Sequence, residues 1–117
     1  MKTVLIVDDS AFMRRLIRNI VIRNGYNVVG EASDGKAGVE KYIELRPDIV
    51  TLDLVMDEMN GLDALKEIIN INSDANVIMI SSMGQDVIVR DAIILGAKNF
   101  LHKPFDEQQM VEALKKL

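Results

Sequence analysis

Four short apolar stretches of the sequence are each followed by side chains that could take part in chemistry. These side chains are the carboxylates Asp8, Asp9 and Asp53, the hydroxyl of Ser81 and the ammonium group of Lys103. If the three carboxylates lie within a few ångströms of one another, they repel strongly unless one is protonated or a cation lies between them. Mg²⁺ is the simplest such cation, because it binds through one or two carboxylates together with water and phosphate oxygens. With a lysine and a serine to bind phosphate oxygens, this set predicts an aspartate that accepts a phosphoryl group.

The elements that would bring these side chains together are five strands alternating with five helices. Runs of apolar and β-branched residues predict strands at 3–7, 27–32, 49–52, 77–80 and 99–102. Helices are predicted between Ser10 and Gly25, between Asp34 and Pro47, around 62–69, at about 86–95, and from Asp106 to Leu117, with 70–76 as a polar connection. This alternation predicts a doubly wound α/β fold with a parallel sheet and helices on both faces. The carboxyl ends of parallel strands lie at one edge of the sheet, where such folds place their sites.

In the first two predicted helices, apolar residues at helical spacing should face the core. They are Phe12, Met13, Leu16, Ile17, Ile20 and Val21 in the first helix, and Val39, Tyr42 and Ile43 in the second. The other faces of the first helix carry four arginines, Arg14, Arg15, Arg18 and Arg23. These arginines predict a solvated surface or, as the alternative, a docking surface for an acidic domain.

The composition is that of one compact domain covering residues 1–117. Of these residues 49% are hydrophobic and 27% are charged, which is enough apolar content to bury a core. The chain has no cysteine, so it holds neither a disulfide nor a thiolate metal site. A net charge of −4 without a basic stripe argues against binding to nucleic acid. No apolar run approaches the ~20 residues that span a bilayer, and residues 1–4 lack the features of a signal peptide, so we expect no membrane insertion and a cytoplasmic location.

Together, these motifs resemble the receiver domain of two-component response regulators. The matching features are Val7-Asp8-Asp9, the loop from Asp53 to Gly61, Ile80-Ser81 and Lys103-Pro104-Phe105. Within this family the chain resembles the single-domain chemotaxis regulators of the CheY kind, over essentially its whole length. The resemblance implies a flavodoxin-like, five-stranded parallel sheet with the strand order 2-1-3-4-5.

The resemblance also implies a role for each residue of the site. Asp53 would be the phosphoacceptor. Asp9 and Asp53 would bind Mg²⁺ directly, together with the backbone carbonyl of Val55, and Asp8 would act through a metal-bound water. Lys103 would pair with the phosphoryl group.

A switch and a partner-binding face follow from the same resemblance. Ser81 would move toward the phosphoryl oxygens on activation, and Phe100, which stands where the family places its switch aromatic, would follow inward. The predicted fourth helix is apolar on more faces than one packing surface requires, so some of its apolar residues should be exposed. We expect Val89, Ile94 and Phe100 to contribute to a partner-binding face.

Three loop positions carry separate expectations. The family usually has proline after the methionine in the loop beside the phosphoacceptor, whereas this chain has Asp57 after Met56. The added carboxylate and the lost φ restriction predict an altered metal affinity or phosphorylation rate with the site intact. Gly61 is expected to permit the turn into the third helix, and the peptide bond before Pro104 is expected to be cis, as is usual in the family.

The function that the resemblance implies is a phosphorylation-activated signalling switch. The chain would catalyse phosphoryl transfer to its own aspartate from the phosphohistidine of a sensor histidine kinase or phosphotransfer domain, and its own dephosphorylation, without being an enzyme for other substrates. Acting as a monomer, it would relay the change to an output protein such as a flagellar motor switch component in chemotaxis. A phosphatase is a further partner that the resemblance allows.

Several alternatives stay open. A Mg²⁺-dependent phosphohydrolase that forms an aspartyl phosphate needs the same carboxylates, and the chain could also be a receiver domain from a longer response regulator. A flavodoxin-like cofactor binder would need a loop rich in Gly, Ser or Thr where Asp8-Asp9-Ser10 stands. Taken singly, the residues have simpler interpretations: Asp8-Asp9 as a helix cap, Ser81 and Lys103 as solvated strand ends, and His102 as a solvent-facing strand residue.

Overall fold

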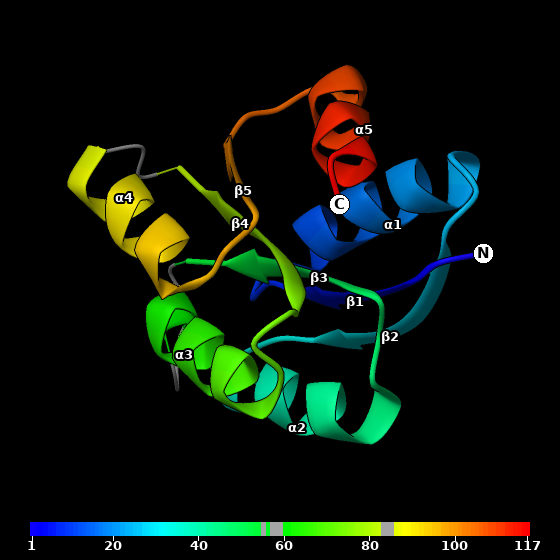
Figure 1. The fold of residues 1–117 in the computed structure, drawn as a ribbon. Coiled ribbons are helices and arrows are strands. Elements are labelled where there is room, and N and C mark those ends of the chain that lie inside the picture. The colour runs from blue at the N-terminus through cyan, green and yellow to red at the C-terminus, as the bar shows by residue number, and fades with distance from the viewer. Residues whose placement is uncertain (55, 57–59, 83–85) are drawn as a thin grey trace.

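Five parallel strands form one sheet through the middle of the molecule (Figure 1). The computed structural model describes residues 1–54, 56, 60–82 and 86–117. The strands are β1 (Thr3–Val7), β2 (Asn27–Ala32), β3 (Ile49–Asp53), β4 (Asn76–Ser81) and β5 (Asn99–His102). Their order is β2-β1-β3-β4-β5 and every neighbouring pair is parallel, so the predicted sheet is confirmed.

The helices cover the sheet in two layers (Figure 1). They are α1 (Ala11–Arg23), α2 (Gly35–Leu45), α3 (Gly61–Ile71), α4 (Asp86–Leu95) and α5 (Glu107–Lys115). Helices α1 and α5 lie on one face, and α2, α3 and α4 lie on the other. The doubly wound α/β prediction is therefore confirmed. Among the described residues, no helix combines the length and the apolar character needed to cross a membrane.

Alternate residues of each central strand enter two separate cores, because successive side chains of a strand point to opposite faces. In β3, Ile49 packs with α1 and α5, while Val50 and Leu52 pack with α2, α3 and α4. All five residues of β3 are buried. This two-sided burial explains why apolar residues occupy neighbouring positions of the strand instead of alternating with solvent-facing polar residues.

Polar side chains fix where the helices begin. Ser10, Asp34, Asn60 and Asp106 each cap a helix by accepting a hydrogen bond from the backbone N–H three residues later. The helix α3 runs to Ile71, two residues beyond its predicted end. Ile71 is partly buried against the core, and the backbone N–H of Asn72 donates to the carbonyl of Ile68, so both packing and capping favour the extra residues.

Two predicted core residues are exposed. Phe12 is 77% exposed and Ile43 is 49% exposed, so their assignment to the core was wrong. At 3.6 residues per turn, Phe12 lies about 140° around α1 from the buried Ile17, and Ile43 lies about 100° around α2 from the buried Tyr42. Both helices have a narrower buried stripe than their apolar content indicates.

Candidate functional site

Side chains from the ends of several strands meet at the carboxyl edge of the sheet. Asp53 is the last residue of β3, Ser81 is the last residue of β4, and Asp8 directly follows β1. The strand register aligns Val7 with Leu52, and Asp53 with Ile80, so these ends stop level with one another. One carboxylate oxygen from each of Asp8, Asp9 and Asp53 lies within 4.8 Å of the others. The three predicted carboxylates are therefore brought together.

Burial differs sharply among these side chains. Asp8 is 1% exposed, Asp53 is 4% exposed and Ser81 is 1% exposed, whereas Asp9 is exposed. The interpretation of Ser81 as a solvated strand end is wrong. Asp8 and Asp9 do not cap α1 either, because Ser10 takes that role by accepting from the N–H of Met13 at 3.2 Å. Buried carboxylates are costly unless they are paired with a cation or hydrogen-bonded, so Asp8 and Asp53 need partners.

Lys103 is a cationic partner for both buried carboxylates. Its Nζ atom lies 3.1 Å from Oδ2 of Asp8 and 3.5 Å from Oδ2 of Asp53, and its side chain is 19% exposed. The backbone N–H of Lys103 donates to the carbonyl of Ser81 at 2.9 Å, which fixes the lysine beside the end of β4. The peptide bond between Lys103 and Pro104 is cis, as expected.

The charge and the donor atoms of this site fit Mg²⁺. Three carboxylates carry three formal negative charges and Lys103 carries one positive charge, so two negative charges remain for a divalent cation to neutralise. All the donors at hand are oxygens, which a hard cation prefers. Asp8, Asp9 and Asp53 could therefore hold the ion. The predicted carbonyl ligand, Val55, lies outside the described residues.

Gly61 packs against the end of β3. Its N–H donates to the carbonyl of Leu54 at 2.8 Å, and a Cβ atom at this position would clash with the backbone oxygen of Asp53 and the Cα of Leu54. Positive φ angles occur at Gly25 and Gly96 but not at Gly61. The glycine is therefore needed for the close approach of α3 to the Asp53 backbone, which is compatible with the expectation that it permits the turn into α3; the reason is space for the backbone and not a positive φ. Asp57, the other loop position singled out above, lies outside the described residues.

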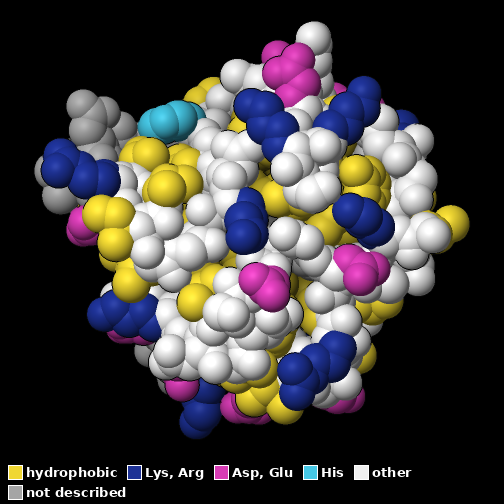
Figure 2. Space-filling model, viewed as in Figure 1, with side chains coloured by type: hydrophobic (Ala, Val, Ile, Leu, Met, Phe, Trp, Pro, Cys, Tyr) yellow, Lys and Arg dark blue, Asp and Glu magenta, His cyan; other side chains and the backbone are white. Residues whose placement is uncertain are grey.

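The expected partner-binding face is partly exposed. Ile94 is 73% exposed, whereas Val89 and Phe100 are half-buried, and Phe100 packs against the core beneath α4. The rings of Phe100 and His102 lie 5.3 Å apart between centroids, and His102 is exposed as expected. Figure 2 shows hydrophobic side chains gathered beside this histidine. Sequence reasoning missed Ile93, which is 46% exposed, although its place beside Ile94 was a usable signal.

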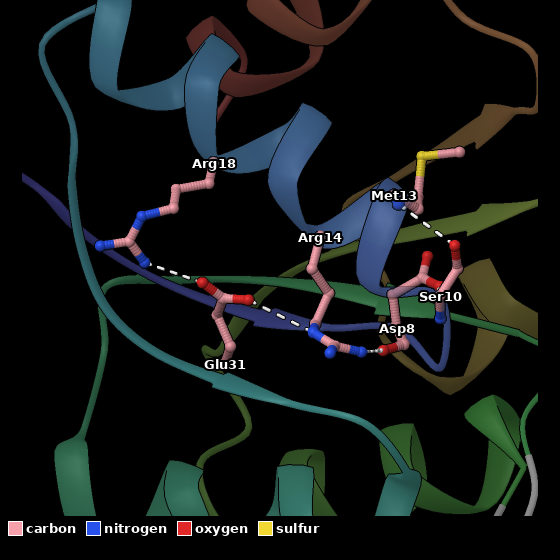
Figure 3. A network of polar contacts seen from close by, with 6 residues as sticks. All are labelled: Asp8, Ser10, Met13, Arg14, Arg18 and Glu31. Carbon is pink, nitrogen blue, oxygen red and sulfur yellow. Dashed lines mark hydrogen bonds and ion pairs between the residues drawn. The ribbon is translucent and has the colours of Figure 1, made fainter.

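One contact of the site was not predicted at all. The guanidinium of Arg14 donates from Nη1 to the backbone carbonyl of Asp8 at 2.6 Å (Figure 3). A helix arginine six residues beyond a carboxylate is not a recognised pattern, and the bond depends on how the loop enters α1. No signal in the sequence would have found it.

The fold and the carboxylates at the edge of the sheet are features of a known class of protein. Comparison of the sequence with known protein families identifies this class. The sequence matches the response regulator receiver domain over residues 4–115, and the chain belongs to that family. It is 54% identical to the chemotaxis protein CheY of Thermotoga maritima, with 99% of this chain and 97% of the relative covered. It is 52% identical to the chemotaxis protein CheY of Bacillus subtilis, with 97% of this chain and 94% of the relative covered.

Solved structures agree with this assignment. A chain of the CheX–CheY–BeF3–Mg²⁺ complex from Borrelia burgdorferi superposes with a TM-score of 0.95 at 39% identity, covering 97% of this chain and 86% of that chain. The response regulator domain of Thermotoga maritima CheB superposes with a TM-score of 0.89 at 40% identity, covering 99% of this chain and 92% of that chain.

Proposed function

We propose that this receiver domain is a phosphorylation-activated switch of two-component signalling, and that Asp53 accepts the phosphoryl group. The observation that carries the proposal is the convergence of Asp8, Asp9 and Asp53 within 4.8 Å, with Lys103 bridging the two buried members. Its relatives named for chemotaxis favour a role in that behaviour. The protein would act in the cytoplasm on its own aspartate rather than as an enzyme for other substrates.

The proposed chemistry is a transfer between two nucleophiles. A carboxylate oxygen of Asp53 attacks the phosphorus of a phosphohistidine, the new O–P bond forms as the N–P bond breaks, and the histidine nitrogen leaves with its electron pair. Mg²⁺, when bound, would supply charge neutralisation for the phosphoryl oxygens. Asp8, Asp9 and Asp53 would hold it, and Lys103 would exchange its carboxylate contact with Asp53 for the phosphoryl oxygens.

The proposed relay starts at Ser81. This buried serine ends β4, and β4 pairs with β5 so that Met79 aligns with Phe100 and Ser81 aligns with His102. A hydroxyl that moves to donate to the phosphoryl group would shift the end of β4, and Phe100 on the neighbouring strand would follow inward. Differential contact of this kind can bias a two-state equilibrium.

The proposed output is a change in partner binding at the surface presented by α4 and β5, the elements that carry the expected residues Val89, Ile94 and Phe100 and the exposed Ile93. A kinase or phosphotransfer domain would supply the phosphoryl group, and an output protein such as a flagellar motor switch component would receive the signal. The structure of a relative in complex with CheX and Mg²⁺ supports an auxiliary partner and the metal. We expect the chain to act as a monomer.

The test is intact-mass spectrometry after incubation with a small-molecule phosphodonor. Wild type with Mg²⁺ should gain a single phosphoryl adduct, whereas wild type with a chelator and the Asp53→Asn variant with Mg²⁺ should gain little or none. No adduct on the wild type, or equal adducts on wild type and variant, would overturn the proposal. Sustained release of phosphate from a simple phosphate ester would instead favour a phosphohydrolase.

A further inference from the structure

Arg14 links the helix α1 to the loop between β1 and α1 that carries Asp8 and Asp9 (Figure 3). It is the fourth residue of α1, and its side chain is only 20% exposed. Its Nη1 atom donates to the carbonyl oxygen of Asp8 at 2.6 Å, and its Nε atom lies 3.3 Å from Oε1 of Glu31. The guanidinium therefore uses donors on two of its nitrogens at once, in a fixed planar geometry that the single nitrogen of a lysine does not reproduce.

Glu31 holds this guanidinium from the neighbouring strand. It lies in β2, and its second carboxylate oxygen is 2.8 Å from Nη1 of Arg18 (Figure 3). The carboxylate of Glu31 thus bridges Arg14 and Arg18, one turn apart on α1. A chain of contacts runs from the exposed surface of α1 through Glu31 and Arg14 to the carbonyl of Asp8.

Asp8 is anchored at every polar group, whereas Asp9 is not. The N–H of Asp8 donates to the carbonyl of Ala32 at 3.0 Å, and its Oδ1 atom accepts from the N–H of Ser10 at 2.9 Å. Among the described residues, no hydrogen bond or ion pair holds the exposed carboxylate of Asp9. The position of that carboxylate therefore depends on the peptide group between residues 8 and 9, whose oxygen is the one that Arg14 binds.

We propose that Arg14 is a positioning residue for the metal site. By binding the carbonyl of Asp8, it orients the peptide between Asp8 and Asp9 and so places the Asp9 carboxylate for Mg²⁺, and Glu31 orients Arg14 in turn. This inference rests on the proposed function, because it assumes that the carboxylates bind Mg²⁺. Partners that orient metal ligands in this way affect metal affinity about 10–100-fold when they are removed.

The direction in which Mg²⁺ affinity changes when Arg14 is replaced distinguishes a positioning role from a simple effect of its charge. A guanidinium near the carboxylates repels a cation, so removing its charge alone should strengthen Mg²⁺ binding. Removing a positioning contact should weaken it. Arg15, the next residue on the same helix, is exposed and offers a matched control for charge without the contact to Asp8.

The experiment measures Mg²⁺ affinity of the full chain by isothermal titration calorimetry, with folding checked by thermal unfolding in the absence of metal. Arg14→Met should weaken Mg²⁺ binding about tenfold, and Arg14→Lys should weaken it as well despite keeping the charge. Arg15→Met should leave the affinity unchanged or slightly stronger. An affinity for Arg14→Met equal to or tighter than that of wild type would overturn the inference.

A second variant covers the case in which Arg14→Met does not fold. Glu31→Asp keeps the charge, shortens the side chain so that it no longer reaches Arg14, and should weaken Mg²⁺ binding about two- to threefold through the looser guanidinium. An unchanged affinity in Glu31→Asp would then count against the inference. If wild type binds Mg²⁺ and is phosphorylated at Asp53 while these variants match it, only the role of Arg14 fails. If wild type binds no Mg²⁺, the inference and the proposed metal site fail together.

Discussion

At the scale of single residues, Thr51 is a polar side chain inside an apolar layer. It is fully buried in β3, two residues after Ile49, and so faces the same core between the sheet and helices α1 and α5. Among the described residues, its hydroxyl has no hydrogen-bond partner. A buried unpaired hydroxyl destabilises a folded protein by about 1–3 kcal/mol, so this residue should lower the stability of the domain.

Replacing Thr51 by valine should therefore stabilise the protein. The Thr51→Val variant keeps the branched shape and exchanges the unpaired hydroxyl for a methyl group, so we expect a gain of about 1 kcal/mol in the free energy of unfolding, measured by urea denaturation. Thr3→Val is the control, because the hydroxyl of Thr3 donates to Asp48 at 3.0 Å and accepts from its N–H at 2.9 Å. That variant should lose stability. Equal effects of the two substitutions would contradict this account.

Lys103 should affect both the stability of the protein and its affinity for Mg²⁺. Without it, Asp8, Asp9 and Asp53 lack their internal cation, so the Lys103→Met variant should lose about 3 kcal/mol of stability in metal-free buffer. The same variant should bind Mg²⁺ on the order of tenfold more tightly, because the lysine no longer competes for the carboxylates. Denaturation with and without Mg²⁺ measures both effects, and Lys98→Met, at an exposed lysine, is the control. Weaker Mg²⁺ binding by Lys103→Met would refute this interpretation.

At the scale of secondary-structure elements, local pattern was enough to predict most boundaries. The five strands were predicted to within a residue at either end, because apolar runs bounded by turn residues mark buried parallel strands. The starts of α1 after Ser10 and of α5 after Asp106 were predicted because residues that can cap a helix are recognisable from the local sequence. The exposure of Phe12 and Ile43 was not predictable, since the width of a buried stripe depends on which other elements cover the helix.

The candidate site likewise has features that could be predicted from the sequence and features that could not. The meeting of Asp8, Asp53 and Ser81 could be predicted because parallel strands end at one edge of a sheet. The contact between Arg14 and the carbonyl of Asp8 could not, because it depends on the path of a loop. The need for glycine at position 61 could not be explained from the sequence either, because it arises from close tertiary contact between α3 and the end of β3.

The junction between β3 and α3 leads to a prediction for Gly61. In Gly61→Ala the new methyl group would meet the backbone of Asp53 and Leu54, which cannot move as a side chain tip can. We expect a loss of about 3 kcal/mol of stability together with slower phosphorylation of Asp53. Gly25→Ala is the control: it has a positive φ of 90° but nothing within 4 Å of a Cβ, so it should cost only about 1 kcal/mol. A smaller loss for Gly61→Ala than for Gly25→Ala would contradict the packing argument.

At the scale of the whole molecule, the carboxyl and amino edges of the sheet differ in their effect on stability. The carboxyl edge brings together the like charges that the proposed chemistry needs. Repulsion between these charges destabilises the folded state. The amino edge is tied together by Asp48, whose carboxylate accepts hydrogen bonds from the backbone N–H and the hydroxyl of Thr3 at 2.8 and 3.0 Å. The carbonyl of Asp48 also accepts from the side chain of Asn76 at the start of β4. The stabilising hydrogen bonds of Asp48 and the candidate site therefore lie at opposite ends of the strands.

The amino edge should make stability depend on pH. The hydrogen bonds from Thr3 hold the pKa of Asp48 below its ordinary value. A carboxyl group whose pKa is lowered by folding stabilises the protein above its unfolded pKa of about 4, and this stabilisation disappears as the pH falls through the lowered folded pKa. Asp48→Asn should therefore be less stable than wild type at pH 7, and the difference should shrink as the pH falls below the unfolded pKa of about 4. Urea denaturation across this range is the check, and a constant difference at all pH values would rule out the linkage.

The central claim is that Asp53, among three neighbouring carboxylates, takes the phosphoryl group. Its most direct test is to reduce the phosphorylated protein with borohydride, which converts an aspartyl phosphate into homoserine with loss of phosphate, and to map the peptides by mass spectrometry. We predict homoserine at position 53, dependent on Mg²⁺ during phosphorylation, with Asp8 and Asp9 unchanged. Homoserine at position 8 or 9, or unmodified aspartate at all three positions, would contradict the account.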